Sequence, residues 1–160
     1  MLNKYLIIAL ISMVPLIELR GAVPIAVTMG LPMVPSFIIA VLFNMLPVPF
    51  IYFFARKVLL WGKDKPIIGK FFSWCLEKGE KGGRKLQETA GNGLFWALFI
   101  FVGIPLPGTG AWTGTLAASI LDIGFKKSSI AVMAGVCLAG LIMLAASQGL
   151  LGVFNAIFGI

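Results

Sequence analysis

Long apolar runs dominate the chain, and proline, glycine or charged residues interrupt each of them. Four such segments can be drawn, at 5–34, 35–55, 93–123 and 128–158. Segments 5–34 and 93–123 break near their centres, and each half is shorter than the roughly 20 residues that a membrane crossing needs. The pattern therefore predicts two broken helical hairpins, each followed by a segment long enough to cross a membrane.

The last of these segments carries signals of its own ends. Ser128 and Ser129 follow a basic pair and are typical N-cap residues, so the helix is predicted to begin there. Gln148 and Gly149 interrupt the apolar run, which predicts one span followed by a short terminal helix.

Composition places these segments in a membrane. The chain has 160 residues, of which 59% are hydrophobic and 12% are charged. Soluble domains average about 45–50% apolar and about 25% charged residues, so this is an integral membrane protein, of a length that suits one domain. The chain has no histidine, and Cys75 and Cys137 have no metal-binding spacing and imply no disulfide. No metal and no cofactor is predicted.

The basic residues set the topology. The formal net charge is +7, and nine of the thirteen Lys and Arg lie between Arg56 and Lys85, so this linker is expected in the cytoplasm. The charge therefore does not imply nucleic acid. Lys126 and Lys127 obey the same rule only if segment 93–123 enters the membrane and returns to the cytoplasm. That segment is thus predicted to be a re-entrant hairpin with Pro105 and Pro107 at its tip.

The N-terminal part repeats this plan in the opposite orientation. Segment 5–34 is a similar hairpin entering from outside, with Pro15, Gly21 and Pro24 at its tip, and a full span follows. The predicted fold is an all-α polytopic membrane protein, an inverted repeat of the kind that many secondary transporters have. Its parts are a first repeat at 1–57, a linker at 58–92 and a second repeat at 93–160.

The linker has a pattern of its own. The stretch PIIGKFFSWCLEK places Ile68, Phe71, Phe72 and Cys75 at helical spacing, with charged residues on the other side. This suits an amphipathic helix on the cytoplasmic leaflet, and a solvated connecting helix is the alternative.

Two broken tips at membrane depth imply a shared cavity covered by protein or water, because unsatisfied backbone groups are costly in lipid. Backbone N–H groups at the second tip, with two threonine hydroxyls and a tryptophan beside them, are candidate contacts for an anionic substrate. The residues concerned are Gly108, Thr109, Gly110, Trp112 and Thr113. The alternative is that the glycines only allow the hairpin to pack closely.

Glu18 and Arg20 are the only charges expected deep within the apolar segments. A charge at the centre of a membrane helix costs on the order of 2.5–3.5 kcal/mol, which predicts a function for both. Arg20 is the candidate anion contact because its planar fork suits oxyanions, and Glu18 is the candidate site for proton or sodium coupling. A static ion pair that holds the hairpin is the alternative.

At this point two motifs carry a resemblance, ELRGAVPIA at 18–26 and GIPLPGTGAWTG at 103–114. The chain resembles the small multidrug export protein family along nearly its whole length. That family is distantly similar to the DedA/VTT superfamily, whose members are linked to lipid translocation and are expected to have paired re-entrant hairpins. DedA proteins carry arginines in the second hairpin, whereas this chain has none between Gly93 and Gly124.

These features together predict a multi-pass transporter in the cytoplasmic membrane of a prokaryote, in contact with membrane lipids and forming a homodimer. The expected substrate is an anionic lipid or an isoprenoid-phosphate-like amphiphile, moved with protons or sodium. The alternatives are a multidrug exporter of lipophilic cations, in which Glu18 is the counter-ion, and a non-transporting assembly factor. An enzyme is not expected, because the chain lacks a histidine for a Ser–His pair, and Asp122 is the only aspartate in the apolar segments, so an aspartyl dyad is missing as well.

Overall fold

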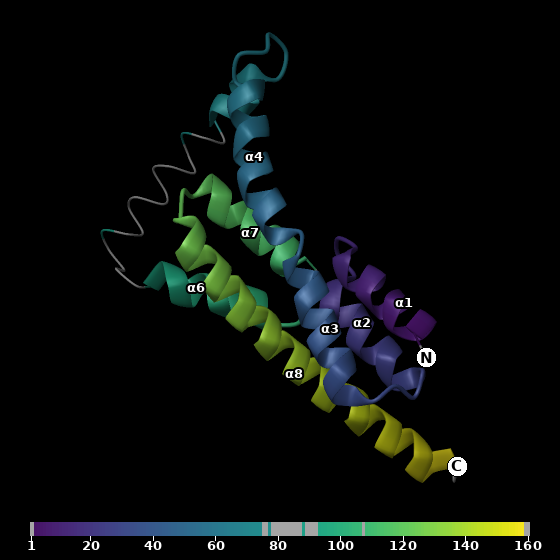
Figure 1. Ribbon diagram of the computed structural model, residues 1–160. Helices are drawn as coiled ribbons and strands as arrows, with labels where there is room; N and C mark the ends of the chain where they lie inside the picture. Colours follow the sequence, from purple (N-terminus) through teal and green to yellow (C-terminus); the bar gives the residue numbers. More distant parts are fainter. Residues whose placement is uncertain (1, 75–76, 78–87, 89–92, 107, 159–160) are drawn as a thin grey trace.

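The computed structural model describes residues 2–74, 77, 88, 93–106 and 108–158. Every regular element in these ranges is an α-helix (Figure 1). In chain order the helices are α1 (Leu2–Met13), α2 (Glu18–Thr28), α3 (Met33–Met45), α4 (Val48–Gly62), α6 (Gly93–Gly103), α7 (Ala111–Ile120) and α8 (Phe125–Phe158). The all-helical fold predicted from the sequence is confirmed for this part of the chain.

Two pairs of short helices form helical hairpins. The first pairs α1, of 12 residues, with α2, of 11 residues. The second pairs α6, of 11 residues, with α7, of 10 residues. At 1.5 Å per residue, each helix is about half as long as a membrane crossing requires.

Two longer apolar stretches are able to cross a membrane by length and composition. They are Met33–Gly62, which combines α3 and α4, and Phe125–Leu150 within α8, with mean hydropathies of 2.2 and 2.4. Figure 1 shows them running in opposite directions past each other, with the hairpins packed against them. The N-terminal stretch is longer than predicted, because apolar residues continue the helix beyond Arg56 as far as Gly62.

Two predictions for the C-terminal segment are wrong. The helix begins at Phe125 and not after Ser128, whose hydroxyl donates to the carbonyl oxygens of Ile123 and Gly124 and does not cap a backbone N–H. The helix also continues through Gln148 and Gly149 to Phe158. A single exposed glycine costs only about 1 kcal/mol in a helix interior, which a long apolar helix absorbs.

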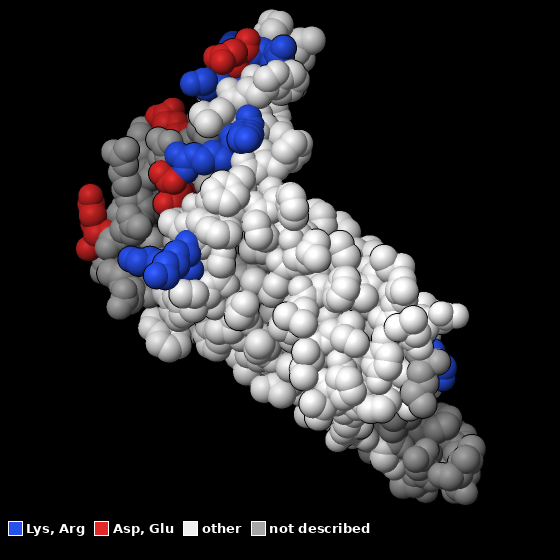
Figure 2. Space-filling view, viewed as in Figure 1, with Lys and Arg blue, Asp and Glu red and all other residues white. Residues whose placement is uncertain are grey.

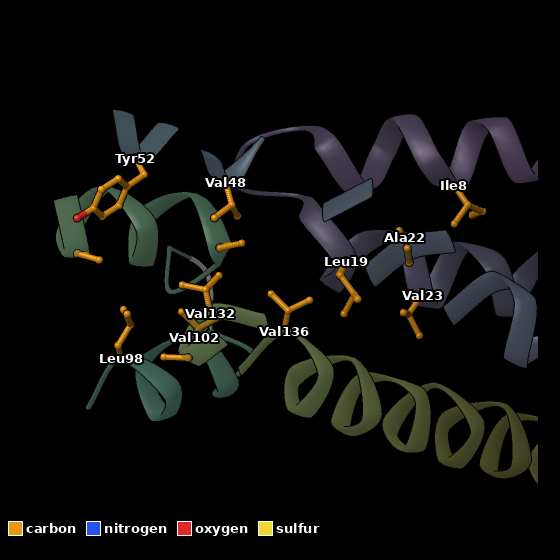
Figure 3. Packing of buried hydrophobic residues seen from close by; sticks show 14 of the residues in the cluster. Ile8, Leu19, Ala22, Val23, Val48, Tyr52, Leu98, Val102, Val132 and Val136 are labelled. Carbon is orange, nitrogen blue, oxygen red and sulfur yellow. The ribbon is translucent and has the colours of Figure 1, made fainter. Parts of the chain in front are cut away.

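The core lies where the two hairpins meet α8 (Figure 3). Leu19 of α2, Val102 of α6, and Val132 and Val136 of α8 are almost completely buried. Small residues let the backbones approach closely, as at Gly135, where an added Cβ would lie 2.7 Å from Val102 Cβ. This packing holds the tips of both hairpins at the centre of the molecule.

Charged side chains gather at one end, where α4 ends and α8 begins (Figure 2). The predicted linker helix begins at this end: residues 69–74 are helical, and the ring of Phe72 packs over Gly62. Phe71 and Trp74 are exposed, with their rings stacked 6.3 Å apart. Cys75 lies outside the described residues, so the predicted pattern is seen only in part.

Candidate functional site

Glu18 binds the start of α7. Its Oε2 accepts a hydrogen bond of 3.0 Å from the backbone N–H of Ala111, and its Oε1 accepts one of 3.1 Å from that of Trp112. The side chain is buried, and the partial positive charge of a helix N-terminus stabilises a carboxylate at this position. The first hairpin thus supplies the negative charge that the N-terminus of α7 favours.

Arg20 binds the end of α6. Its Nη2 donates to the carbonyl oxygens of Val102 (3.2 Å) and Ile104 (3.1 Å) and to the hydroxyl of Thr109 (3.0 Å). Carbonyl groups at a helix C-terminus carry partial negative charge, which suits a guanidinium. The closest approach of the two charged side chains is 3.5 Å, between Arg20 Nη1 and Glu18 Oε2.

The local sequence creates these two helix ends. After α6, the hydroxyl of Thr109 donates toward the carbonyls of Ile104 and Leu106, and Gly108 adopts a φ of 85° that glycine permits at little cost. The first tip is strained instead, because Leu16 and Glu18 have φ values of 71° and 50°. Such values persist only where surrounding contacts hold them, and the N–H groups of α7 supply that contact for Glu18.

Gly110 lies against the carboxylate. A Cβ at this position would lie 1.8 Å from Glu18 Oε2, so no residue with a side chain fits without moving Glu18. The predicted alternative for the glycines, close packing of the hairpin, therefore describes Gly110. Gly108 differs, because an added Cβ would meet nothing within 4 Å and the requirement there is its backbone conformation.

Trp112 ties the two tips together a second time. Its indole N–H donates to the carbonyl oxygen of Met13 at the end of α1 (3.2 Å), in addition to the bond from its backbone N–H to Glu18. Thr113 is held within its own helix, where its hydroxyl donates to the carbonyl oxygen of Gly110.

The remaining tip residues fall in different places. Pro15 lies in the break between α1 and α2, whereas Gly21 and Pro24 lie inside α2, because the break closes at Ile17 and the helix begins at Glu18. Pro105 lies in the break after α6. Pro107 lies outside the described residues.

A cavity of about 330 Å³ opens beside the meeting tips. The lining brings together both tips, α4 and α7: Pro15, Leu16, Glu18, Arg20, Ile51, Phe54, Ala55, Gly108, Gly110, Trp112, Thr113 and Leu116. The lining is apolar except at its central charged pair and Thr113. Leu16 and Phe54 are 71% and 66% exposed, so the mouth of the cavity opens on an exposed apolar surface.

A second polar group closes the seam between α4 and α7 beyond this cavity. Ser119 Oγ donates to the carbonyl oxygen of Tyr52 (2.7 Å), and Tyr52 OH donates to that of Ile123. Arg56 and Asp122 form an ion pair nearby. Asp122 thus lies at the charged end of the molecule.

Comparison with protein families gives a match that includes Glu18, Arg20, the second tip and the seam between α4 and α7. The family described as "Putative small multi-drug export protein" matches residues 18–142. The chain belongs to this family. Comparison with curated proteins and comparison with solved structures each gave no match. The DedA/VTT relation and the homodimer stay predictions.

Membership of the small multi-drug export family supports a membrane exporter rather than an enzyme. None of the described residues forms a group of three or more His, Cys, Asp or Glu that could hold a metal ion. The family match begins at Glu18, the residue that joins the two hairpins.

Sequence reasoning missed several members of this exporter's site. Val102 and Ile104 contribute carbonyl oxygens, and Ala111 contributes a backbone N–H, so their side chains gave no signal. For Asn44 the sequence leaves open whether it faces the cavity or bonds to a neighbouring helix; it is 1% exposed and lines a small cavity with Glu18 and Arg20. The reach of Arg20 to the end of α6, more than 80 residues away in the chain, had no local signature.

Proposed function

We propose that this protein is a secondary exporter built as an inverted repeat, in which the two hairpins are re-entrant and meet at the membrane midplane. Hydrogen bonds that recur at a constant spacing support the repeat. Five bonds at the end of α2 and the start of α3 have counterparts 92 residues later, at the end of α7 and the start of α8. The donors are Met29, Gly30, Leu31, Ser36 N and Ser36 Oγ, against Leu121, Asp122, Ile123, Ser128 N and Ser128 Oγ.

The backbone and packing follow the same register. Gly30 follows α2 and Asp122 follows α7, and both have left-handed φ values, of 67° and 55°. The α1 helix packs on α3 as α6 packs on α8, and α2 packs on α8 as α7 packs on α4. Glu18 is the first residue of α2 and binds the start of α7, so these two helices meet at their N-termini and point to opposite ends of the molecule. Opposite orientation is what an inverted repeat requires.

We infer that the substrate is a small lipophilic molecule that enters the cavity from the membrane. A volume of about 330 Å³ lies at the lower end of the range for ligand pockets, about 300–1,000 Å³. Apolar walls and a mouth on the lipid-facing surface favour a molecule that partitions into lipid. Glu18 lines this cavity, so a lipophilic cation suits the site and agrees with the family's description.

An anionic amphiphile is the second candidate, because Arg20 and the second tip also line the cavity. The α7 N–H groups that would bind an anion are engaged by Glu18, and Arg20 Nη2 already donates to three oxygen atoms. An anion would have to displace Glu18 from the helix N-terminus. We therefore place the cation ahead of the lipid phosphate.

Coupling through Glu18 has a physical basis in this arrangement. A proton or a sodium ion on the carboxylate competes with the N–H groups of Ala111 and Trp112, so ion binding would loosen the first hairpin from the second. Glu18→Gln is expected to leave a folded protein whose export no longer depends on the ion gradient. Export by Glu18→Gln that still follows the gradient would remove Glu18 from the coupling step.

The cavity is tested by filling it. Ala55→Phe adds a ring inside the cavity and leaves both charged residues in the sequence, and Ala97→Phe adds the same ring in a separate apolar cavity between α6 and α7. In liposomes loaded with a lipophilic cationic dye, Ala55→Phe is expected to lose export, while Ala97→Phe keeps it. Equal activity of both variants would exclude this cavity as the substrate site.

The same liposomes separate the remaining classes. Lipid phosphates tested in place of the dye measure the second candidate directly. A protein that exports neither kind of molecule under an imposed proton or sodium gradient would be a non-transporting membrane factor.

A further inference from the structure

We propose that the substrate site has a second face, between α2 and α8, which opens when the protein faces the opposite side of the membrane. This inference rests on the proposed exporter and on the 92-residue register of its repeats. The residues assigned to the second face are Gly21, Pro24, Met143, Ala146 and Ser147, which no comparison assigns to a site.

The register divides the cavity into two parts. Glu18 corresponds to Gly110, and Arg20 corresponds to Trp112, and all four line the present cavity. If each repeat takes the conformation that the other has now, these four residues still lie at the centre of the site. A substrate held there keeps the same central contacts whichever side of the molecule is open.

The flank of the cavity does not map onto itself. Thr113 and Leu116 of α7 correspond to Gly21 and Pro24 of α2, 92 residues earlier. Three residues of α4 line the same flank, and their counterparts lie 92 residues later in α8: Ile51 with Met143, Phe54 with Ala146, and Ala55 with Ser147. Exchange of the two conformations thus replaces the α4–α7 flank by an α2–α8 flank.

The α2–α8 face is more closed in this structure than its counterpart beside α4 and α7. Ser147 is 9% exposed, whereas its counterpart Ala55 lines the cavity of about 330 Å³. Pro24 is half-buried, whereas its counterpart Leu116 lines the same cavity and is 42% exposed. One flank is open while its repeat-related partner is more buried, which is the asymmetry expected of one state of an alternating-access cycle.

The direction follows from where the flanks lie. Ala55 precedes Arg56 at the charged end of the molecule, which is the expected cytoplasmic side. Ser147 lies 22 residues after Phe125, about 33 Å along α8 at 1.5 Å per residue, and so near the opposite side. The structure therefore corresponds to the state that loads substrate from the cytoplasmic leaflet, and the α2–α8 face is the exit.

Two disulfide traps related by the register test this assignment. Pro24 and Leu116 are equivalent, as are Met143 and Ile51. Double cysteines at Pro24 and Met143 should hold the α2–α8 face closed, and the matched pair at Leu116 and Ile51 should close the flank between α4 and α7. Each disulfide is expected to abolish dye export by proteoliposomes, with recovery after reduction. Full export with the Pro24–Met143 disulfide in place would overturn the proposal.

Labelling gives a readout that does not need transport. In a background without other cysteines, Ser147→Cys should react with a membrane-impermeant maleimide added from outside, and the Pro24–Met143 disulfide should block this reaction. Ser128→Cys, which is on the same helix and also buried, should stay unlabelled. Ser147→Cys that is never labelled, or is labelled equally with the α2–α8 face held closed, would reject the second face. Absence of dye export with labelling as expected would reject the proposed substrate and leave the second face standing.

Discussion

Glu18 and Arg20 lie 3.5 Å apart at their closest, which is farther than either lies from its partners on the second hairpin. Each charge is bound mainly by the opposite end of a helix dipole. A membrane interior makes an isolated charge costly, and this arrangement neutralises both charges without requiring that they neutralise each other. Glu18 and Arg20 therefore hold the two hairpins together, and their direct contact within the first hairpin is the weaker interaction.

This arrangement predicts additive losses of stability. Glu18→Gln and Arg20→Gln should each lower the free energy of unfolding, since hydrogen bonds to charged groups contribute about 1.5–3 kcal/mol. If the helix ends are the main partners, the double variant should show roughly the sum of the two losses. The measurement is thermal or denaturant unfolding of all four proteins in the same detergent.

A static ion pair predicts the opposite result. Removal of one partner would then strand the other charge, and the double change would restore part of the lost stability. Recovery of the double variant above both single variants would show that the direct contact, and not the two helix ends, is the main interaction.

The second tip predicts a graded response to added side chains. Gly110→Ala should be the most harmful, because its Cβ would lie 1.8 Å from Glu18 Oε2. Gly108→Ala should cost about 1–2 kcal/mol through its left-handed backbone alone. Gly124→Ala, where nothing lies within 4 Å, is the control and should be tolerated. Similar unfolding temperatures for all three variants would contradict the close contact at Gly110.

Much of this fold was readable from the sequence, for identifiable reasons. The breaks between α1 and α2 and between α6 and α7 appear because proline and glycine interrupt apolar runs. The charged end appears because Lys and Arg cluster in the linker. Glu18 and Arg20 stood out because charges in apolar segments are costly. Their binding partners could not be found, because these are backbone atoms at helix ends brought close only by tertiary packing.

The repeat shows the same limit. Apolar pattern and charge indicate two related units, but their identity in sequence is slight, and the alignment of Gly21 with Gly110 that the pattern suggests is three residues away from the register of the backbone bonds. The register became visible only through backbone hydrogen bonds, such as those of Leu31 to Ala26 and of Ile123 to Ala118. The start of α8 was misplaced for a related reason, since a serine can bond backward to a carbonyl as readily as it caps a helix.

The proposed inverted topology predicts which lysines share a side of the membrane. Single cysteines at Lys63 and Lys126 should react with an impermeant reagent from the cytoplasmic side, because both flank the charged end. Lys4 lies at the open end of the first hairpin, where its ammonium donates to the carbonyl oxygen of Met29. A cysteine at position 4 should react from outside. Labelling of Lys63 and Lys126 from opposite sides would make the second hairpin a simple span.

The last prediction concerns Asn44, whose Oδ1 has no hydrogen-bond partner among the described residues. Arg20 Nε is in the same condition, and both residues line a cavity of about 10 Å³ with Glu18. One water needs about 10–15 Å³, and a water here would accept from Arg20 Nε and donate to Asn44 Oδ1.

Two substitutions that remove buried polar groups test whether a water joins Asn44 to Arg20 or the Asn44 amide has no role. Asn44→Leu should lower stability by about 1–3 kcal/mol, because loss of the bridge leaves the Arg20 N–H unsatisfied. Thr115→Val is the control: its hydroxyl is also buried without a partner, yet Thr115 does not line this cavity. Thr115→Val should leave the free energy of unfolding unchanged or raise it. Unfolding measurements in which Asn44→Leu is as stable as Thr115→Val would exclude a bridging water between Asn44 and Arg20.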